Sequence, residues 1–376
     1  MKCVAVLGGG PAGAFAAAEL ASAGLKVTVF DEKLAWEKPC GGGLTHKAYD
    51  RYPFLVENAA AKKKVWRTVL GAAGAGSVRL DLDKPIVIYS RFELNRLLLE
   101  RAEDAGAQLE KTRVLSIERV SRGWRIRTRH GIAEADFCIL AAGARNPLRE
   151  FGTALRPADT MSALGYFVPG DREEIDVQFL ERLEGYIWVF PRCGHLSVGI
   201  CGKGEPAPSL RKRLEDYLTR CGIPWKGSQF YSHLLPALDA ASWKQNRVSG
   251  EGWLAIGDAA GLVDPVTGEG LFYALRSAEL AAQALLNNGL AGYAGALSGD
   301  FARDLERGSE LASQIFLGRF LFGSTPARIV QFTRRSPRFR ALMQDLFAGT
   351  QSYLGLDARL YRGLPRTLLE ISESFV

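Results

Sequence analysis

The first 32 residues carry the feature that most constrains the fold of this chain. The segment "KCVAVLGGGPAGAFAAAELASAGLKVTVFDE" contains a short apolar run, Val4–Leu7, then a glycine-rich turn, an alanine-rich stretch and a second apolar run, Lys26–Phe30. Gly8, Gly10 and Gly13 have the spacing G-x-G-x-x-G, with Pro11 and Ala12 between the last two. In this spacing the first glycine permits a tight turn, the second admits a pyrophosphate and the third lets a helix pack on the strand. The segment therefore predicts a strand–turn–helix–strand unit that binds a dinucleotide.

The end of the second strand supports the same interpretation. Asp31 and Glu32 close the run, and Asp31 follows Gly13 by 18 residues. An acid at about this distance binds the ribose hydroxyls of a dinucleotide, while the helix N-terminus offers free N–H groups to its phosphates. The alternative is a glycine-rich turn that holds no ligand. The motif alone does not separate FAD from NAD.

A second glycine cluster, "KPCGGGL", follows a few residues later. Cys40 precedes three consecutive glycines, Gly41, Gly42 and Gly43. Glycine lacks Cβ, so such a run allows the backbone to approach a flat ring or a substrate where any side chain would clash. We expect this loop to form one wall of a ligand site, and Cys40 to be its candidate catalytic residue. A buried, inert thiol is the alternative for Cys40.

Composition excludes several classes of protein. The six cysteines and four histidines show neither a CxxC pair nor metal-ligand spacing, so we expect no metal site. Free thiols suit a reducing cytoplasm. No apolar stretch approaches the length of a membrane-spanning helix. The net charge of +7 permits an anionic ligand or membrane surface, and no motif supports nucleic-acid binding.

The rest of the chain suggests three regions. Residues 1–151 and 247–288 are predicted to form a discontinuous nucleotide-binding domain. Residues 152–246, with part of 62–84, read as short strands of a mixed sheet and one helix at 210–221. Residues 289–376 are predicted to be a C-terminal helical region. The pattern is that of an α/β protein with an added sheet.

Five motifs in order resemble those of the geranylgeranyl reductase family of FAD-dependent oxidoreductases. They are "GGGPAG" with "KPCGGGL", "YSRFELNRLLLERAEDAGAQL", "ADFCILAAGARNPLRE", "GYIWVFPRCGHLSVGI" and "GDAAGLVDPVTGEGLFYALRSAELAA". The resemblance implies a Rossmann-like FAD-binding domain of the glutathione reductase and para-hydroxybenzoate hydroxylase type, a mixed β-sheet substrate domain and C-terminal helices. It also implies FAD as cofactor.

The resemblance assigns roles to individual residues. FAD contacts are implied for the glycine turn, for the acids Asp31 and Glu32, and for Cys40, Gly41 and Gly42 beside the isoalloxazine ring. Asp258 is implied to bind the ribityl hydroxyls. Further contacts are implied for Arg91, the backbone at Val114, Ala142, Gly143, Gly268, Gly270 and Leu271. Substrate contacts are implied for the strand that carries Tyr186, Trp188, Phe190, Pro191 and Arg192. The three aromatic residues alternate, so they share one face of a strand; packing in a sheet core is the alternative. Two positions depart from the family pattern: Ala142 replaces an aspartate, and Arg192 replaces a lysine.

The activity implied is reduction of isolated C=C bonds of an isoprenoid lipid or precursor by reduced FAD. A flavin-dependent monooxygenase or halogenase acting on a small molecule is the alternative, and a non-catalytic flavin redox sensor is a third possibility. The electron donor is open between NADPH, ferredoxin and others. Ala142 puts a role of its turn in binding a second nucleotide in doubt.

The tail suggests a location. Residues 311–340 carry six arginines and no acid, among the apolar residues Ile315, Phe316, Leu317, Phe320, Leu321 and Phe322. A basic, aromatic surface favours anionic lipid, although a solvated basic helix face has the same composition. We expect a monomer in the cytoplasm, peripherally associated with the inner face of the membrane.

Overall fold

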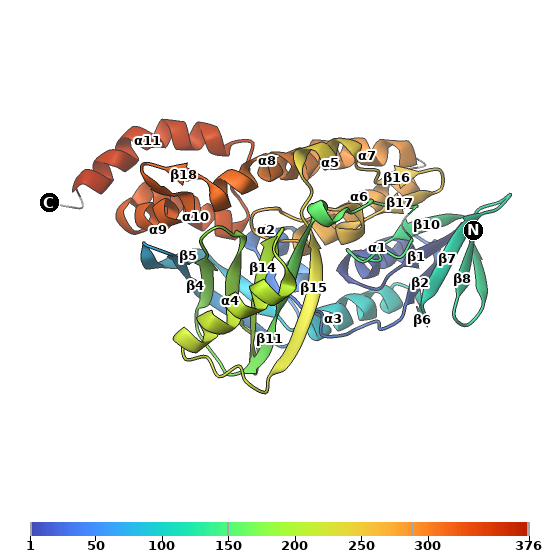
Figure 1. Ribbon diagram of the computed structural model, residues 1–376. Helices are drawn as coiled ribbons and strands as arrows, with labels where there is room; N and C mark the ends of the chain where they lie inside the picture. Colours follow the sequence, from blue (N-terminus) through green and yellow to red (C-terminus); the bar gives the residue numbers. More distant parts are fainter. Residues whose placement is uncertain (1, 149, 288, 374–376) are drawn as a thin grey trace. The chain divides into compact units, whose positions relative to one another are not determined.

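The computed structural model describes residues 2–148, 150–287 and 289–373 and contains two compact units (Figure 1). Unit 1 comprises Met1–Lys38, Arg91–Thr160 and Leu235–Glu306, and unit 2 comprises Pro39–Ser90, Met161–Leu234 and Arg307–Val376. The chain therefore passes from one unit to the other five times. The domain boundaries expected from the sequence, after residues 151, 246 and 288, remain a prediction.

Unit 1 is built on a six-stranded sheet with the order β16–β17–β10–β1–β2–β6. The strands β1 (Cys3–Leu7), β2 (Lys26–Asp31), β6 (Gln108–Lys111), β10 (Phe137–Leu140) and β17 (Trp253–Ala255) run parallel, and the edge strand β16 (Ser249–Gly250) pairs antiparallel with β17. Val6 and Leu140 are fully buried, as expected for parallel strands covered on both faces. The predicted strand–turn–helix–strand unit is thereby confirmed.

Three helices of unit 1 position the loops at the carboxyl ends of these strands. Helix α1 (Pro11–Ser22) packs against both α3 (Arg91–Asp104) and α6 (Leu271–Leu286). It begins at Pro11, because proline fits the first turn of a helix, where its missing N–H is not needed. It ends before Gly24, whose φ of 84° continues the chain in the left-handed region.

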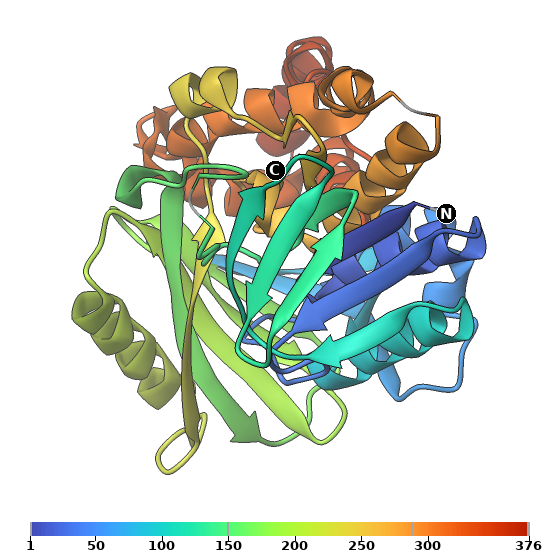
Figure 2. The same cartoon turned by 90° about the vertical axis from the view of Figure 1, so that its right-hand side faces the viewer.

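The remaining elements of unit 1 are small. An antiparallel sheet contains β7 (Val114–Arg119), β8 (Trp124–Thr128) and β9 (Ile132–Ala135), teal to green in Figure 2. The helical elements are η2 (Pro157–Asp159), α5 (Ala240–Gln245), η3 (Gly257–Ala260), η4 (Leu290–Gly292), α7 (Tyr293–Leu297), the π-turn η5 (Ser298–Ala302) and the start of α8 (Arg303–Leu317), which continues into unit 2.

Unit 2 contains a mixed eight-stranded sheet with the order β15–β11–β14–β13–β12–β4–β5–β3. The strands are β3 (Gly43–Leu44), β4 (Lys62–Ala72), β5 (Gly76–Tyr89), β11 (Thr160–Pro169), β12 (Ile175–Phe179), β13 (Glu184–Pro191), β14 (His195–Lys203) and β15 (Gln229–Pro236). The pair β12–β4 is parallel, and β4–β5, β12–β13, β13–β14 and β11–β14 are antiparallel. Segment 62–84, expected to leave the nucleotide-binding domain, lies within β4 and β5 of this sheet.

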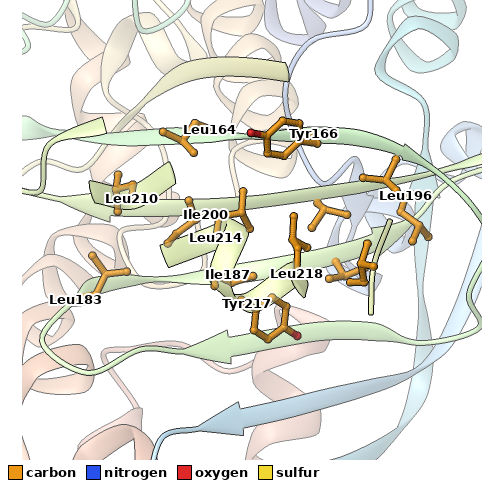
Figure 3. Close-up of a cluster of buried hydrophobic side chains, with 14 residues drawn as sticks. Leu164, Tyr166, Leu183, Ile187, Leu196, Ile200, Leu210, Leu214, Tyr217 and Leu218 are labelled. Carbon is orange, nitrogen blue, oxygen red and sulfur yellow. The ribbon is translucent and has the colours of Figure 1, made fainter. Parts of the chain in front are cut away.

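One face of the large sheet is covered by α4 (Ala207–Arg220), an element predicted at 210–221. Leu210, Leu214 and Leu218 lie one turn apart and are fully buried. They pack against Ile187 and Ile200 of the sheet (Figure 3). Because side chains alternate along a strand, residues 186, 188 and 190 of β13 point to the opposite face.

On that opposite face, α9 (Thr325–Arg335) and α10 (Pro337–Ala348) pack on β4 and β5. The other elements of unit 2 are α2 (His46–Arg51), η1 (Pro53–Leu55), α11 (Leu356–Glu373) and the hairpin β18 (Arg319–Phe320) and β19 (Gly323–Ser324). The predicted C-terminal helices are present, and this hairpin interrupts them. Gly318 precedes the hairpin and Gly323 begins its second strand, and both weaken helix formation.

Candidate functional site

The three glycines of the first turn are required for different reasons. A Cβ on Gly13 would lie 1.9 Å from Gly8 O, and a Cβ on Gly8 would lie 2.3 Å from Ala141 O. These two glycines are therefore fixed by the packing of α1 and β10 against the turn. A Cβ on Gly10 would meet no atom within 4 Å, and its φ of −68° is open to any residue. Protein packing therefore does not explain the glycine at position 10.

The two candidate acids behave differently. Asp31 Oδ2 accepts from Gly9 N at 2.7 Å, and Asp31 Oδ1 accepts from the backbone N–H groups of Lys33 and Leu34. Glu32 instead forms an ion pair with Arg129 on the surface. Asp31 thus lies at the glycine turn and holds its shape, which makes it the stronger candidate of the two.

Arg91 is the first residue of α3 and is only 3% exposed. Its Nη2 donates to Asn95 Oδ1 at 3.2 Å, and Glu37 accepts from its backbone N–H. Within the described residues no ion pair to Arg91 is formed, and its buried Nε has no hydrogen-bond partner. An uncompensated buried cation is unfavourable, so this position suits an anionic group such as a phosphate.

Asp258 lies in η3, at the end of β17. Its Oδ2 accepts from Lys38 Nζ at 3.0 Å, and both side chains are mostly buried. A Cβ on Gly257 would lie 3.0 Å from Ala12 Cβ, and one on Gly270 would lie 3.4 Å from Asp258 Oδ1. Asp258 is thus close to the N-termini of both α1 and α6, where the helix dipoles favour a negative charge.

The remaining residues predicted at the cofactor lie on nearby loops of unit 1 or at a strand end. Ala142 N would lie 3.1 Å from a Cβ on Gly8, so the Ala142–Gly143 turn adjoins the glycine turn. Gly268 N donates to Asp264 O, and this loop leads to Leu271 at the start of α6. Val114 is the first residue of β7. Asp264, which also accepts from Val266 N, was not predicted, although a buried acid before a turn is a usual loop-forming residue.

The loop formed by Cys40 and the three glycines that follow it, called the Cys40 loop below, lies in unit 2. Cβ atoms on Gly41 and Gly43 would meet the ring of Phe190 at 3.1 and 3.0 Å, and a Cβ on Gly42 would meet Tyr89 O at 2.2 Å. We expected a flat ring against this backbone, and at Gly41 and Gly43 the ring is that of Phe190. The Cys40 thiol accepts from Gly42 N at 3.3 Å.

A buried hydrogen-bond cluster holds the Cys40 carbonyl. Arg192 is fully buried, and its guanidinium donates to Cys40 O and, at 3.4 Å, to Gly41 O. Ser197 Oγ donates to Cys40 O at 2.8 Å and lies 3.1 Å from Tyr231 Oη. Burial raises the pKa of Tyr231, so this hydroxyl stays protonated. Arg192, predicted at the substrate, thus contacts the loop backbone in the structure.

The aromatic residues of β13 share the face opposite α4. The rings of Tyr186 and Trp188 are 6.2 Å apart, and Phe316 of α8 stacks on Tyr186 at 6.4 Å. The Trp188 ring covers Gly199 of β14, where a Cβ would lie 2.3 Å from it. Pro191 is buried at the end of the strand. Phe316, predicted for a surface, is buried against this aromatic group instead.

Two further cysteines are buried and do not suggest a second reactive centre. Burial raises the pKa of Cys138 and of Cys201 to about 12, so both stay neutral thiols. Within the part of the chain that the structure describes, no cluster of His, Cys, Asp or Glu has the arrangement of a metal site. None of the described helices is both long and apolar enough to cross a bilayer.

Sequence reasoning missed Lys38, Ser197 and Tyr231 as members of these clusters. Lys38 was visible next to Pro39 and Cys40, but its partner is 220 residues away. Ser197 and Tyr231 lie on strands whose pairing no local pattern reveals.

The residues present fit FAD. The open space at Gly10, the buried Nε of Arg91 and the first-turn N–H groups of α1 offer a pyrophosphate site within unit 1.

Comparisons with known proteins agree. Residues 2–151 match the FAD binding domain family. The chain is 30% identical over 329 residues to the menaquinone reductase of Mycobacterium tuberculosis, covering 77% of each chain. It is 28% identical over 319 residues to the geranylgeranyl diphosphate reductase of a Synechocystis strain, covering 76% of each. A geranylgeranyl bacteriochlorophyll reductase-like structure from Thermoplasma acidophilum matches with a TM-score of 0.78 at 22% identity, covering 96% of this chain and 98% of that one.

The fold is therefore the mixed α/β, FAD-binding fold of the para-hydroxybenzoate hydroxylase type, with mixed sheets and C-terminal helices. The motifs, the site geometry and these relatives place the chain in the group of FAD-dependent oxidoreductases that contains the menaquinone and geranylgeranyl reductases.

Proposed function

We propose that this enzyme reduces isolated C=C bonds of an isoprenoid lipid or its precursor. The observation that carries the proposal is the aromatic face of β13, formed by Tyr186, Trp188 and Phe190, of which Phe190 packs directly on the Cys40 loop. An aromatic, uncharged surface with a few polar groups is the usual lining of a site for an apolar ligand. The names of the two relatives, a geranylgeranyl diphosphate reductase and a menaquinone reductase, support this substrate class.

The cofactor would be held by unit 1. The N–H groups at the start of α1, the bare backbone at Gly10 and the Arg91 guanidinium would bind its phosphates. Asp31 would accept from ribose hydroxyls, and Asp258 would accept from the ribityl chain while Lys38 balances its charge. When bound and reduced, FAD supplies a hydride to one carbon of the double bond.

The second carbon of the double bond needs a proton, and the Cys40 Sγ is our candidate to supply it. The cluster of Arg192, Ser197 and Tyr231 fixes the Cys40 carbonyl. A fixed carbonyl limits the positions that the thiol can take, which favours a defined donor geometry. Arg192 is therefore proposed as a positioning residue rather than as a contact for a diphosphate.

The test is single turnover with a panel of prenyl alcohols, diphosphates and prenylated lipids after anaerobic photoreduction of the flavin. We expect flavin reoxidation without oxygen and a product that gains two hydrogens. A product that gains oxygen only after air is admitted would replace this proposal with hydroxylation. Flavin that stays reduced with every member of the panel would favour a redox sensor. Photoreduction makes the result independent of whether NADPH or ferredoxin is the natural donor.

A further inference from the structure

The hairpin β18–β19 has a turn made of two bulky apolar residues. Leu321 and Phe322 are its central positions, with φ of 46° and 60°. Two-residue turns with positive φ at both positions normally contain Asn-Gly, because Cβ is unfavourable there. Phe322 is fully exposed and Leu321 is 43% exposed. The turn therefore exposes two apolar side chains to solvent, and its positive φ angles are unfavourable for both residues.

The rest of the hairpin is fixed to α9. Arg328 donates to Phe320 O at 3.3 Å and also donates to Leu321 O. The Phe320 ring packs edge-on against Phe332, with ring centres 6.2 Å apart. The Phe320 and Leu321 carbonyls thus accept hydrogen bonds from protein, while the Phe322 side chain at the tip is fully exposed. The hairpin is therefore a structured protrusion that is held to α9 by hydrogen bonds and aromatic packing.

The surroundings of the hairpin are basic. Residues 307–376 carry ten arginines, no lysine and five acids. Acids in this segment pair with Arg307, Arg338 and Arg359. Arg319, at the base of the hairpin, is exposed and forms no ion pair within the described residues. The local excess of positive charge is complementary to an anionic surface.

Helix α11 extends the same chemistry. It contacts α9, as the hairpin does. Its exposed residues include Tyr361, Leu368 and Leu369 together with Arg362 and Arg366. An amphipathic helix with exposed apolar and arginine side chains is typical of elements that lie in a membrane interface.

We propose that the β18–β19 hairpin inserts Leu321 and Phe322 into an anionic phospholipid bilayer, with Arg319 at the level of the headgroup phosphates. Apolar side chains at the tip gain by leaving water, and the arginine beside them gains by approaching lipid phosphate. The inference deepens the proposed function, since an isoprenoid lipid resides in a bilayer. It is tested by binding alone, so its failure and a failure of reduction are distinguishable.

The experiment is co-sedimentation of the flavin-loaded protein with vesicles of phosphatidylcholine and with vesicles of an equal mixture of phosphatidylcholine and phosphatidylglycerol. We expect binding to the mixed vesicles that weakens as salt is added. The double variant Leu321→Asn/Phe322→Gly should bind at least about tenfold more weakly, because two apolar side chains are lost. Its melting temperature should stay the same or rise, because Asn-Gly suits this turn. Arg319→Gln should weaken binding about fivefold on mixed vesicles alone.

The matched control is Ile132→Asn, which removes an apolar side chain that is 63% exposed on β9 of unit 1. It should bind as the wild type does. The proposal is overturned if the wild type fails to bind the mixed vesicles, or if the double variant binds them as tightly as the wild type. It is also overturned if sedimentation velocity shows that the double variant dissociates a dimer while vesicle binding stays unchanged, since the tip would then contact a second copy.

Discussion

Lys38 Nζ lies 3.0 Å from Asp258 Oδ2, although the two residues are 220 positions apart in the chain. The pair joins the residue before the Cys40 loop to the turn after β17. Both side chains are mostly buried, at 20% and 14% exposure, so the pair is less screened than a surface ion pair. It ties an early and a late segment of unit 1 together at the edge of the sheet where the glycine turn lies.

We predict that Lys38→Met lowers the free energy of unfolding by about 2 kcal/mol, between the values for exposed and buried pairs. Asp258 keeps its charge in this variant and loses its ion pair with Lys38. Urea denaturation of the flavin-free protein measures the effect. Lys26→Met, at an exposed position of β2, is the matched control and should leave the midpoint unchanged. Equal midpoints for the two variants would mean that the pair contributes nothing to stability.

Gly10 and Gly13 should respond in opposite ways to alanine. Gly10→Ala should fold with unchanged stability, because its Cβ meets no protein atom, and should bind FAD at least about tenfold more weakly. Gly13→Ala should lose stability, since its Cβ would overlap Gly8 O. Thermal denaturation without flavin, with titration by free FAD, separates the two effects. Unchanged FAD affinity in Gly10→Ala would show that the open space is not used by the cofactor.

Cys40→Ser should keep FAD bound and lower turnover at least about tenfold, because a hydroxyl is a weaker acid than a thiol. Cys193→Ser, which changes an exposed thiol, is the control. The rate constants are measured in single turnover with the photoreduced enzyme. If Cys40→Ser matches the wild type, Cys40 is a packing residue.

The contact between Gly41 and Phe190 can be tested by a double-mutant cycle. Gly41→Ala places a Cβ 3.1 Å from the Phe190 ring, which is closer than most Cβ contacts in proteins. We expect a loss of about 1–3 kcal/mol of stability from overpacking. Phe190→Leu should relieve part of this loss when combined with it, giving a coupling energy above about 0.5 kcal/mol by urea denaturation. Additive losses would show that the ring does not constrain the loop.

Asp159 should make stability depend on acid pH. Burial disfavours its charged form, but hydrogen bonds from Arg156 and Ser242 outweigh it and hold the pKa of Asp159 below its ordinary 3.8. A carboxylate whose pKa is lowered on folding stabilises the protein above its unfolded pKa, and this contribution is lost as pH falls through the folded pKa. Asp159→Asn should therefore destabilise by about 2 kcal/mol at neutral pH. The difference from wild type should shrink below about pH 3.8. A constant difference across this range would contradict the assignment.

Local sequence patterns correctly predicted those helices and strands whose formation depends mainly on nearby residues. The first strand–turn–helix–strand unit, the short strands between 160 and 203 and helix α4 follow from glycine spacing and apolar periodicity, and the structure contains them. The family resemblance located the same loops that the structure collects around Gly8, Asp31 and Asp258 in unit 1.

The features that the sequence did not reveal depend on contacts between residues far apart in the chain. Arg192 is predicted from the sequence at the substrate, but the fold of unit 2 buries it against the Cys40 carbonyl. Phe316 and Phe322 lie six positions apart in one apolar, basic stretch, yet one is buried and the other fully exposed. Only the tertiary contacts of α8 and α9 separate them. The hairpin between these helices was missed because two bulky residues with positive φ contradict the usual turn chemistry.

The five passages of the chain between the units also bear on synthesis. The glycine turn leaves the ribosome well before Asp258, which follows Lys38 by 220 residues. At about 5–20 residues per second, translation takes on the order of 10–45 s to supply that partner. During this interval the early part of unit 1 lacks β17 and α6, so its helix α1 has nothing to cover one side. A nascent chain of this protein therefore exposes part of its nucleotide-binding core until α6 has been synthesised, and we expect the cofactor to bind only after that point.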